Sequence, residues 1–401
     1  MLLWSCSPAM DYGGQLRTLA IVPEYPAGEE LSGESTVTVT VEDAISGASY
    51  TKNSTTDGGL TFKLPDGNYR VRFSRVVYGA EGDETIYNGS REKIIIARED
   101  VKVSVPLTKT IPGKLVFKEI YCGGCQKYPV EGNYQSDKYV IIHNNSAAVQ
   151  YLDGYCFGTL DPYNSSSTSV WHKTDPESGE LIWPDSVPVI QAVLQFPGNG
   201  SDFPLESGED AVLCLTGAID HSLLYPNSVN LNNEDYFVCY NQSYFPNVTY
   251  HPAPGDKIRT DHYMDIVVKT GQANAYTLSV SSPAVVLFKA PDGIDLREYL
   301  GTEGAIVQKP GTASDRIVQI PVGWVEDAVE VFTNSISGSS KRINPPLDAG
   351  YVRLTETFQG RALKRRTDET ASAKAGYEKL RDTNNSSSDW YVTERNSQSL
   401  K

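Results

Sequence analysis

Residues 35–41 read STVTVTV and alternate threonine with valine at every second position. Successive side chains of a β-strand point to opposite faces, so this period places the valines on one face and the threonines on the other. The pattern offers no apolar stripe to a helix, whose period is 3.6 residues. It predicts a half-buried strand and therefore a sheet with one face in a core.

The same period continues through the first quarter of the chain. A predicted hairpin has two alternating strands on either side of a turn at Pro65-Asp66-Gly67, the turn chemistry that hairpins favour. Its apolar positions are Leu60, Phe62 and Leu64 before the turn and Tyr69, Val71 and Phe73 after it. Two more strands are expected at 93–97 and 101–105. These strands predict one β domain over residues 16–108.

Composition extends this prediction to the whole chain of 401 residues, which is long enough for two or three domains. The 33 glycines, 23 prolines and 24 tyrosines are typical of short strands joined by turns, so an all-β protein is expected. The net charge of −15 would repel a phosphate backbone, which argues against nucleic acid as a partner. The best internal apolar run, Ala284–Phe288, has the length of a strand and not of a membrane span.

The N-terminal pattern resembles a known kind of module. An alternating strand, an aspartate-glycine turn and a Pro-x-Gly-x-Tyr turn into the last strands, here Pro65 to Tyr69, are similar to carboxypeptidase regulatory-like or prealbumin-like sandwiches. The resemblance covers about 90 residues, and it implies a fold and not an activity, because such modules occur as spacers on many surface proteins.

A second domain is expected at 114–401, after a linker at 108–113. The segments LVFKEIYCGG, 137–158, 196–215 and 380–390 resemble a lamin-tail-like Ig sandwich, as do the closing residues Gly360–Arg366. More closely, the whole chain resembles an uncharacterised family of Bacteroides-type surface lipoproteins in which such a domain follows a prealbumin-like one. The lamin-tail pattern has a glutamate in its second strand, where this chain has Tyr139, Val140, Ile141 and His143, so the usual carboxylate is missing.

Residues 216–280 are predicted to be a long insertion in this second sandwich, rich in turn formers and aromatic residues and poor in periodic core. Long loops with aromatic side chains are frequent binding sites, and tyrosine suits sugar rings or protein loops. The alternative is a loop that merely covers the sandwich. The candidate ligand-binding residues are Tyr225, Tyr236, Tyr240, Tyr244, Phe245, Tyr250 and Tyr263.

The first residues, MLLWSC, resemble the end of a bacterial lipoprotein signal, in which the cysteine after a small residue is lipidated. Cys6 is therefore the candidate lipidation site, and residues 1–15 are expected to be a signal remnant and tether. A basic start and most of an apolar core are lacking, so either the true start lies upstream of Met1 or the resemblance is coincidental. An acylated Cys6 would place the protein at the outer membrane or cell surface.

The remaining five cysteines cannot all pair, so no dense disulfide framework is expected. Cys122-Gly123-Gly124-Cys125 has the spacing of a redox motif, but a strand precedes it, whereas a redox cysteine needs a helix N-terminus. A zinc site would need Cys156 and His143 to join Cys122 and Cys125. A disulfide or plain packing of thiols is the preferred interpretation, and no metal or cofactor is predicted.

Catalytic patterns are weak. The chain has no GxSxG motif, and its histidines lack metalloprotease spacing. The adjacent pairs Asp220-His221 and Asp261-His262 would point to opposite sides of a strand, where they could not touch, and they are interpreted as loop residues. Asp292-Gly293-Ile294-Asp295 is interpreted as a solvated turn and not as a calcium site.

These observations predict a non-enzymatic, lipid-anchored surface protein with a β-sandwich stalk and a recognition domain that binds a protein or glycan. An accessory lipoprotein of a TonB-type nutrient or iron importer is one alternative, since relatives of this lipoprotein class commonly lie beside such receptors. A surface glycan hydrolase is the other, and it would require two carboxylates about 5–10 Å apart in a cleft.

Overall fold

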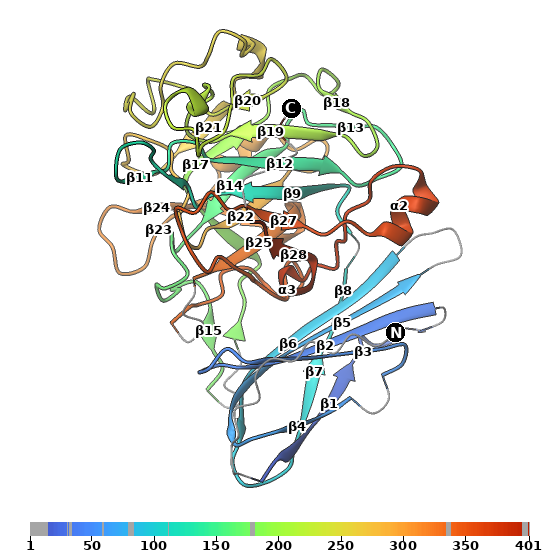
Figure 1. Ribbon diagram of the computed structural model, residues 1–401. Coiled ribbons are helices and arrows are strands. Elements are labelled where there is room, and N and C mark those ends of the chain that lie inside the picture. The colour runs from blue at the N-terminus through green and yellow to red at the C-terminus, as the bar shows by residue number, and fades with distance from the viewer. Residues whose placement is uncertain are drawn as a thin grey trace. The chain divides into compact units, whose positions relative to one another are not determined.

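The computed structural model describes residues 15–29, 31, 34–57, 60–78, 84–110, 112–176, 181–333, 338–394 and 400. In this part of the chain the elements are mostly strands, with short α-helices and 3-10 turns between them (Figure 1). The chain divides into two compact units, residues 1–109 and 110–401. The predicted all-β class is confirmed.

The first unit has two sheets. The smaller sheet has the order β4-β1-β7, and the larger has the order β3-β2-β5-β6-β8. The strands of the smaller sheet are β1 (Arg17–Glu24), β4 (Thr61–Leu64) and β7 (Val101–Pro106). Those of the larger are β2 (Glu34–Asp43), β3 (Ser49–Ser54), β5 (Gly67–Tyr78), β6 (Glu84–Ile96) and β8 (Thr108–Thr110).

One core lies between these sheets. Val37, Val39 and Val41 of β2 are all 0% exposed, whereas the intervening threonines reach solvent, as the period-two pattern predicts. The valines join Leu19 of the smaller sheet and Phe73 of the larger in a single apolar cluster. The alternation in the sequence therefore becomes the inner face of a sandwich.

The predicted linker at 108–113 is partly wrong. Residues 108–110 form β8, which pairs with β6 at the edge of the five-stranded sheet. Lys109 also forms an ion pair of 3.0 Å with Glu29. The division between the units thus falls within β8, between Lys109 and Thr110.

The second unit is built around two larger sheets. The first, of six strands, has the order β20-β19-β12-β9-β27-β28, and the second, of eight, has the path β23-β24-β17-β14-β22-β25-β26 with β21 paired to β17. The first sheet contains β9 (Leu115–Tyr121), β12 (Tyr139–Asn144), β19 (Asp210–Cys214), β20 (Phe237–Val238), β27 (Leu363–Arg365) and β28 (Trp390–Val392). The second contains β14 (Cys156–Leu160), β17 (Ser186–Gln195), β21 (Asp265–Lys269), β22 (Ala284–Phe288), β23 (Ile306–Gln308), β24 (Arg316–Pro321), β25 (Val325–Phe332) and β26 (Val352–Arg353).

Short elements complete this unit. Three two-stranded ribbons are formed by β10 (Cys125–Gln126) with β11 (Asn133–Tyr134), β13 (Gln150–Tyr151) with β18 (Pro204–Leu205), and β15 (Lys173–Thr174) with β16 (Leu181–Ile182). The helices are α1 (Leu296–Leu300), α2 (Glu369–Ala375) and α3 (Ser386–Asp389), and the 3-10 turns are η1 (His221–Leu223), η2 (Thr260–His262) and η3 (Val322–Trp324).

Both faces of the central strands are buried. The main core lies between the two sheets, and a second cluster covers the other face of the eight-stranded sheet. A third cluster packs residues from 218–258 onto the other face of the six-stranded sheet. Strands β9, β12 and β22 are therefore buried at every position. This explains why β22 reads as a continuous apolar run rather than as an alternating one. Strands β9 and β12 also bury polar residues, namely Lys118, Glu119, His143 and Asn144.

Segment 216–280 is more than an insertion. Its short strands β20 and β21 extend both sheets, and Phe237, Cys239, Tyr276 and Leu278 lie in the main core. The segment is poor in periodic core, as expected, but it still contributes many residues to the core clusters. Its apolar side chains are spaced irregularly because they reach the core from loops and not from regular strands.

Candidate functional site

A pocket of about 300 Å³ lies in the second unit where three segments distant in sequence meet. They are β10, residues 226–228 of segment 216–280, and residues 358–360 just before β27. The lining residues are Cys125, Gln126, Pro226, Asn227, Ser228, Phe358, Gln359 and Gly360. Volumes near this size are at the lower end for small-ligand sites.

Backbone hydrogen bonds hold the three segments together. The N–H groups of Phe358 and Gly360 donate to the carbonyls of Gly123 and Gly124 at 2.9 and 3.0 Å. The Asn227 side-chain amide donates to the Gln126 carbonyl at 3.1 Å. Gly124 has a φ of +69°, and a Cβ there would collide with the carbonyl oxygen of Tyr134. The Cys-Gly-Gly-Cys sequence thus makes the tight turn that starts the β10–β11 ribbon.

A buried carboxyl group lies behind the pocket wall. Asp137 is 0% exposed, and its Oδ2 accepts hydrogen bonds from the Ser228 hydroxyl at 2.5 Å, the Tyr121 hydroxyl at 3.2 Å and the Cys125 thiol at 3.7 Å. Its Oδ1 has no hydrogen-bond partner in the described part of the chain. Burial raises the pKa of Asp137, and the hydrogen bond from Ser228 counteracts this. Two wall residues are thereby oriented from behind by one carboxyl group.

His221 joins the β10–β11 ribbon to segment 216–280. The Tyr134 hydroxyl lies 2.7 Å from His221 Nδ1, and His221 Nε2 lies 2.8 Å from the Gly217 carbonyl. Burial lowers the pKa of His221. A neutral ring that donates from Nε2 and accepts at Nδ1 satisfies both contacts. Both nitrogens are used within the protein, so His221 acts as a structural bridge beside the pocket.

The seven predicted ligand-binding rings have different environments. Tyr236 and Phe245 are 5% and 1% exposed and belong to the core clusters. The assignment of these two residues to ligand binding is therefore wrong. Phe245 packs in the core between the sheets, and Tyr236 packs on the outer face of the six-stranded sheet. Tyr244 is 40% exposed, and the other four rings, those of Tyr225, Tyr240, Tyr250 and Tyr263, are half-buried.

Two of the half-buried rings adjoin the β10–β11 ribbon. The Tyr225 ring centroid lies 4.7 Å from that of Tyr134, with the Lys127 ammonium 5.5 Å away over the ring. The Tyr250 hydroxyl accepts a bond of 3.4 Å from Gln135. Tyr240 and Tyr263 instead pack edge to face, with 5.7 Å between centroids. The sequence pattern singled out the segment that contributes to the pocket wall, but the wall residues themselves are its neighbours Pro226, Asn227 and Ser228.

The four weak zinc candidates have other roles. His143 contacts Asp210 Oδ1 at 2.7 Å through Nδ1 and the Glu378 carbonyl at 2.9 Å through Nε2. Cys156 lies in β14 of the other sheet and contacts the Gly154 carbonyl. Within the described ranges, no group of three or more His, Cys, Asp or Glu residues could hold a metal ion.

The described cysteines are unpaired thiols, all buried. Burial raises the pKa of Cys122 to about 12, and burial together with Asp137 does the same for Cys125. Both thiols therefore stay protonated at neutral pH, which opposes redox chemistry of the Cys122–Cys125 motif. Of the alternatives drawn from sequence, packing of small thiols describes what the structure shows.

A charged cluster occupies the strand end where the lamin-tail pattern would have its carboxylate. The Lys118 ammonium lies 2.6 Å from Asp210 Oδ2 and 2.7 Å from Glu378 Oε2. His143 shares Asp210 with it. The carboxylates come from β19 and from the segment after α2 instead of from β12, so a search within β12 alone missed them.

Both Asp-His pairs lie at 3-10 turns and not within strands, in agreement with their interpretation as loop residues. His262 Nδ1 lies 2.8 Å from Asp261 Oδ1, because these residues form a 3-10 turn and not a strand. The ring of His262 stacks on Phe237 with 4.6 Å between centroids. Asp220 instead caps η1 by accepting from the Ser222 N–H.

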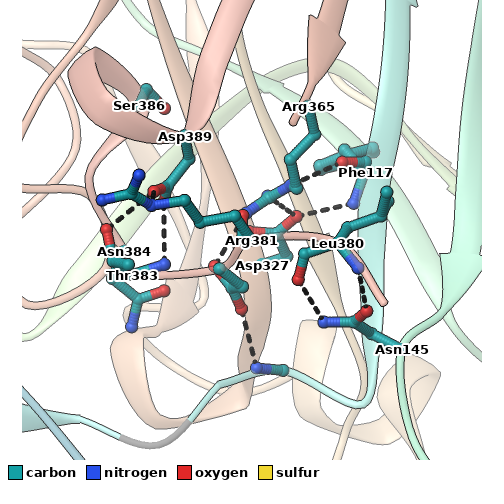
Figure 2. A network of polar contacts seen from close by, with 12 residues as sticks. Phe117, Asn145, Asp327, Arg365, Leu380, Arg381, Thr383, Asn384, Ser386 and Asp389 are labelled. Carbon is teal, nitrogen blue, oxygen red and sulfur yellow. Dashed lines mark hydrogen bonds and ion pairs between the residues drawn. The ribbon is translucent and has the colours of Figure 1, made fainter. Parts of the chain in front are cut away.

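The second unit also contains a fully buried ionic network (Figure 2). Arg365 of β27 donates to the Phe117 carbonyl at 2.7 Å, to Asp327 Oδ2 at 2.6 Å and to Asp382 Oδ1 at 2.7 Å. The guanidinium also lies over the Trp390 ring, 5.0 Å from its centroid. The network joins the first strand of the unit to its C-terminal residues.

Comparisons with known proteins agree with the fold. Residues 206–397 match the model of a family described as a protein of unknown function (DUF4876). A crystal structure of a DUF4876 family protein from Bacteroides thetaiotaomicron is 25% identical to this chain, with a TM-score of 0.59 and coverage of 94% of both chains. The predicted likeness to an uncharacterised Bacteroides family is thus supported. The prealbumin-like and lamin-tail-like assignments stay predictions.

Other comparisons add little. A structure of a putative adhesin from Bacteroides ovatus covers 75% of this chain and 90% of its own, at 10% identity and a TM-score of 0.22. So low a score does not indicate a shared fold. No curated protein gives a significant match. Among the described residues, no helix is long and apolar enough to cross a membrane. Cys6 lies outside the described residues.

Proposed function

We propose that the protein is a non-enzymatic binding protein whose second unit recognises a glycan at the pocket between β10, residues 226–228 and residues 358–360. The pocket carries the proposal because its wall is polar and uncharged. Gln126, Asn227, Ser228 and Gln359 supply amide and hydroxyl groups, and Pro226 and Phe358 supply apolar surface. Sugars present the same mixture of hydroxyl groups and apolar ring faces.

The surroundings of the pocket support recognition rather than chemistry. None of its lining residues is Asp or Glu, so the pocket wall lacks the pair of carboxylates that a glycosidase uses. The carboxyl group of Asp137 and the His221 ring lie behind the wall and are engaged by protein groups. A site held rigid from behind loses little entropy on binding a ligand.

The location of the protein at the outer membrane is part of the same proposal. Acylation of Cys6 would hold the chain at the outer membrane, where the second unit would meet polysaccharides outside the cell. The likeness to a Bacteroides family is consistent with such a location.

A glycan array probed with the full chain tests the proposal. The matched pair is Asn227→Trp, which fills the pocket from an exposed rim position, and Val248→Trp, which adds the same ring at a position 61% exposed and outside the lining. We expect wild type and Val248→Trp to bind the same glycans and Asn227→Trp to lose them. Equal binding by all three proteins, or release of a shortened glycan, would contradict the proposal.

A further inference from the structure

Several hydrogen-bond donors of the pocket wall are already used within the protein. Ser228 and Cys125 direct their protons to Asp137 Oδ2. Asn227 directs its amide to the Gln126 carbonyl. The backbone N–H groups of Phe358 and Gly360 donate to the Gly123 and Gly124 carbonyls. These donors in the pocket wall are thus engaged before a ligand arrives.

The acceptors of the same groups stay available. A serine hydroxyl that donates one hydrogen bond keeps two lone pairs, and an asparagine that donates through its nitrogen keeps its carbonyl oxygen. Ser228 Oγ and Asn227 Oδ1 can therefore receive hydrogen bonds from a molecule in the pocket. The exposed side-chain amides of Gln126 and Gln359 supply donors at the rim.

The pocket wall also lacks cations. None of the eight lining residues is Lys, Arg or His. The cations that adjoin these segments in sequence already have partners: Lys127 lies over the Tyr225 ring, and Arg361 forms an ion pair of 3.4 Å with Glu356. An anionic group would lose its water shell here without gaining a cation or a cradle of N–H groups. The net charge of −15 adds repulsion.

We propose that the pocket selects ligands by hydrogen-bond polarity: it binds the hydroxyl-rich edge of a neutral sugar residue and rejects carboxylated or sulfated residues. This inference rests on the proposed function and specifies its ligand class. Neutral hydroxyl groups can donate to Ser228 Oγ and Asn227 Oδ1, whereas a carboxylate or sulfate has no proton for these two acceptors and would find donors only in the rim amides of Gln126 and Gln359.

The test compares neutral glycans with their carboxylated and sulfated counterparts, using immobilised neutral hexose oligomers, uronic acid oligomers and sulfated hexose oligomers. For wild type we expect the charged forms to bind about tenfold more weakly or worse, since one unpaired charge near a protein surface costs on that scale. Gln359→Lys adds a cation at an exposed lining position and should narrow this difference. Gln272→Lys, an exposed change outside the lining, makes the same change in net charge and should leave the difference intact.

The outcomes separate the two proposals. If wild type binds glycans and Asn227→Trp does not, but uronate or sulfated forms bind as tightly as neutral ones, the polarity inference is overturned and the binding function stands. The inference is equally overturned if Gln272→Lys changes the preference as much as Gln359→Lys. If no glycan of any charge binds, both proposals fail together.

Discussion

The Ser228 hydroxyl donates a hydrogen bond of 2.5 Å to the carboxyl group of Asp137, across 91 positions of sequence. The contact joins the long segment between β19 and β21 to the residue just before β12. One oxygen of the buried Asp137 carboxyl depends on Ser228, Tyr121 and Cys125 for its partners. The shape and hydrogen-bond polarity of the pocket wall therefore depend on the Asp137 carboxyl group, which lies behind the wall and not among the lining residues.

Ser228→Ala tests this dependence. Loss of the hydroxyl removes a partner of a buried carboxyl group, which should lower the free energy of unfolding by ~1–3 kcal/mol. Chemical denaturation measures the change, with the exposed Ser243→Ala as control, for which ~0.5 kcal/mol or less is expected. Glycan affinity should fall in Ser228→Ala alone. A Ser228→Ala variant as stable as wild type would show that the contact matters little.

Arg365→Met tests the buried network of the second unit. The substitution leaves Asp327 and Asp382 buried without their cation, and removal of one partner from such a cluster costs ~3–5 kcal/mol. The control is Arg361→Met, whose ion pair of 3.4 Å with Glu356 joins side chains 36% and 60% exposed. Such surface pairs contribute ~1 kcal/mol or less. Thermal unfolding should separate the two variants, and similar melting temperatures would be evidence against a stabilising role of the network.

The cluster of Lys118, Asp210 and Glu378 predicts sensitivity to acid. Burial acts to raise the pKa of Asp210, but His143 and Lys118 lower it overall, and Lys118 likewise lowers the pKa of Glu378 against the effect of burial. A carboxyl group whose pKa is lower in the folded chain than in the unfolded chain stabilises the fold at pH values above its unfolded-state pKa. That stabilisation is lost as the pH falls through its folded-state pKa.

The free energy of unfolding should therefore decrease as the pH drops below about 4.5, the ordinary pKa of glutamic acid. Asp210→Asn should reduce this slope and should also destabilise the protein at pH 7, where Lys118 loses one of its two carboxylates. Denaturation at several pH values measures both effects. The exposed Asp292→Asn should leave both unchanged, and an unaltered slope in Asp210→Asn would refute the assignment.

Lipidation is a separate prediction. With a complete signal sequence supplied, the full chain should enter the outer-membrane fraction and incorporate labelled fatty acid at Cys6. Cys6→Ser should move the protein to the soluble fraction, because acyl chains are the anchor that the sequence offers. A serine variant that stays with the membrane, together with an unlabelled wild type, would place the attachment elsewhere.

The sequence predicted the fold class well because period-two patterns report directly on the faces of a sheet. Val37, Val39 and Val41 are buried in the order that the alternation requires. The resemblance of residues 360–366 to closing strands implied that this ending pairs back in the sandwich without naming a partner strand, and β27 pairs with β9. These predictions depend on local sequence or on a pattern shared across a family.

The pocket was not predictable in the same way. Its three segments are joined by backbone hydrogen bonds such as that from Gly360 to Gly124, which no side-chain pattern records. The aromatic residues of segment 216–280 were predicted to bind a ligand, yet Tyr236 and Phe245 are core residues. A tyrosine suits a core and a binding surface equally, so composition alone could not separate the two.

The most direct test of the binding site is a crystal structure of the full chain with the glycan that binds most tightly on the array. We expect a neutral sugar residue in the pocket, with its hydroxyl groups within hydrogen-bond distance of Ser228 Oγ and Asn227 Oδ1. A sugar bound instead against Tyr244 or the Tyr240–Tyr263 pair, with the pocket empty, would contradict this expectation.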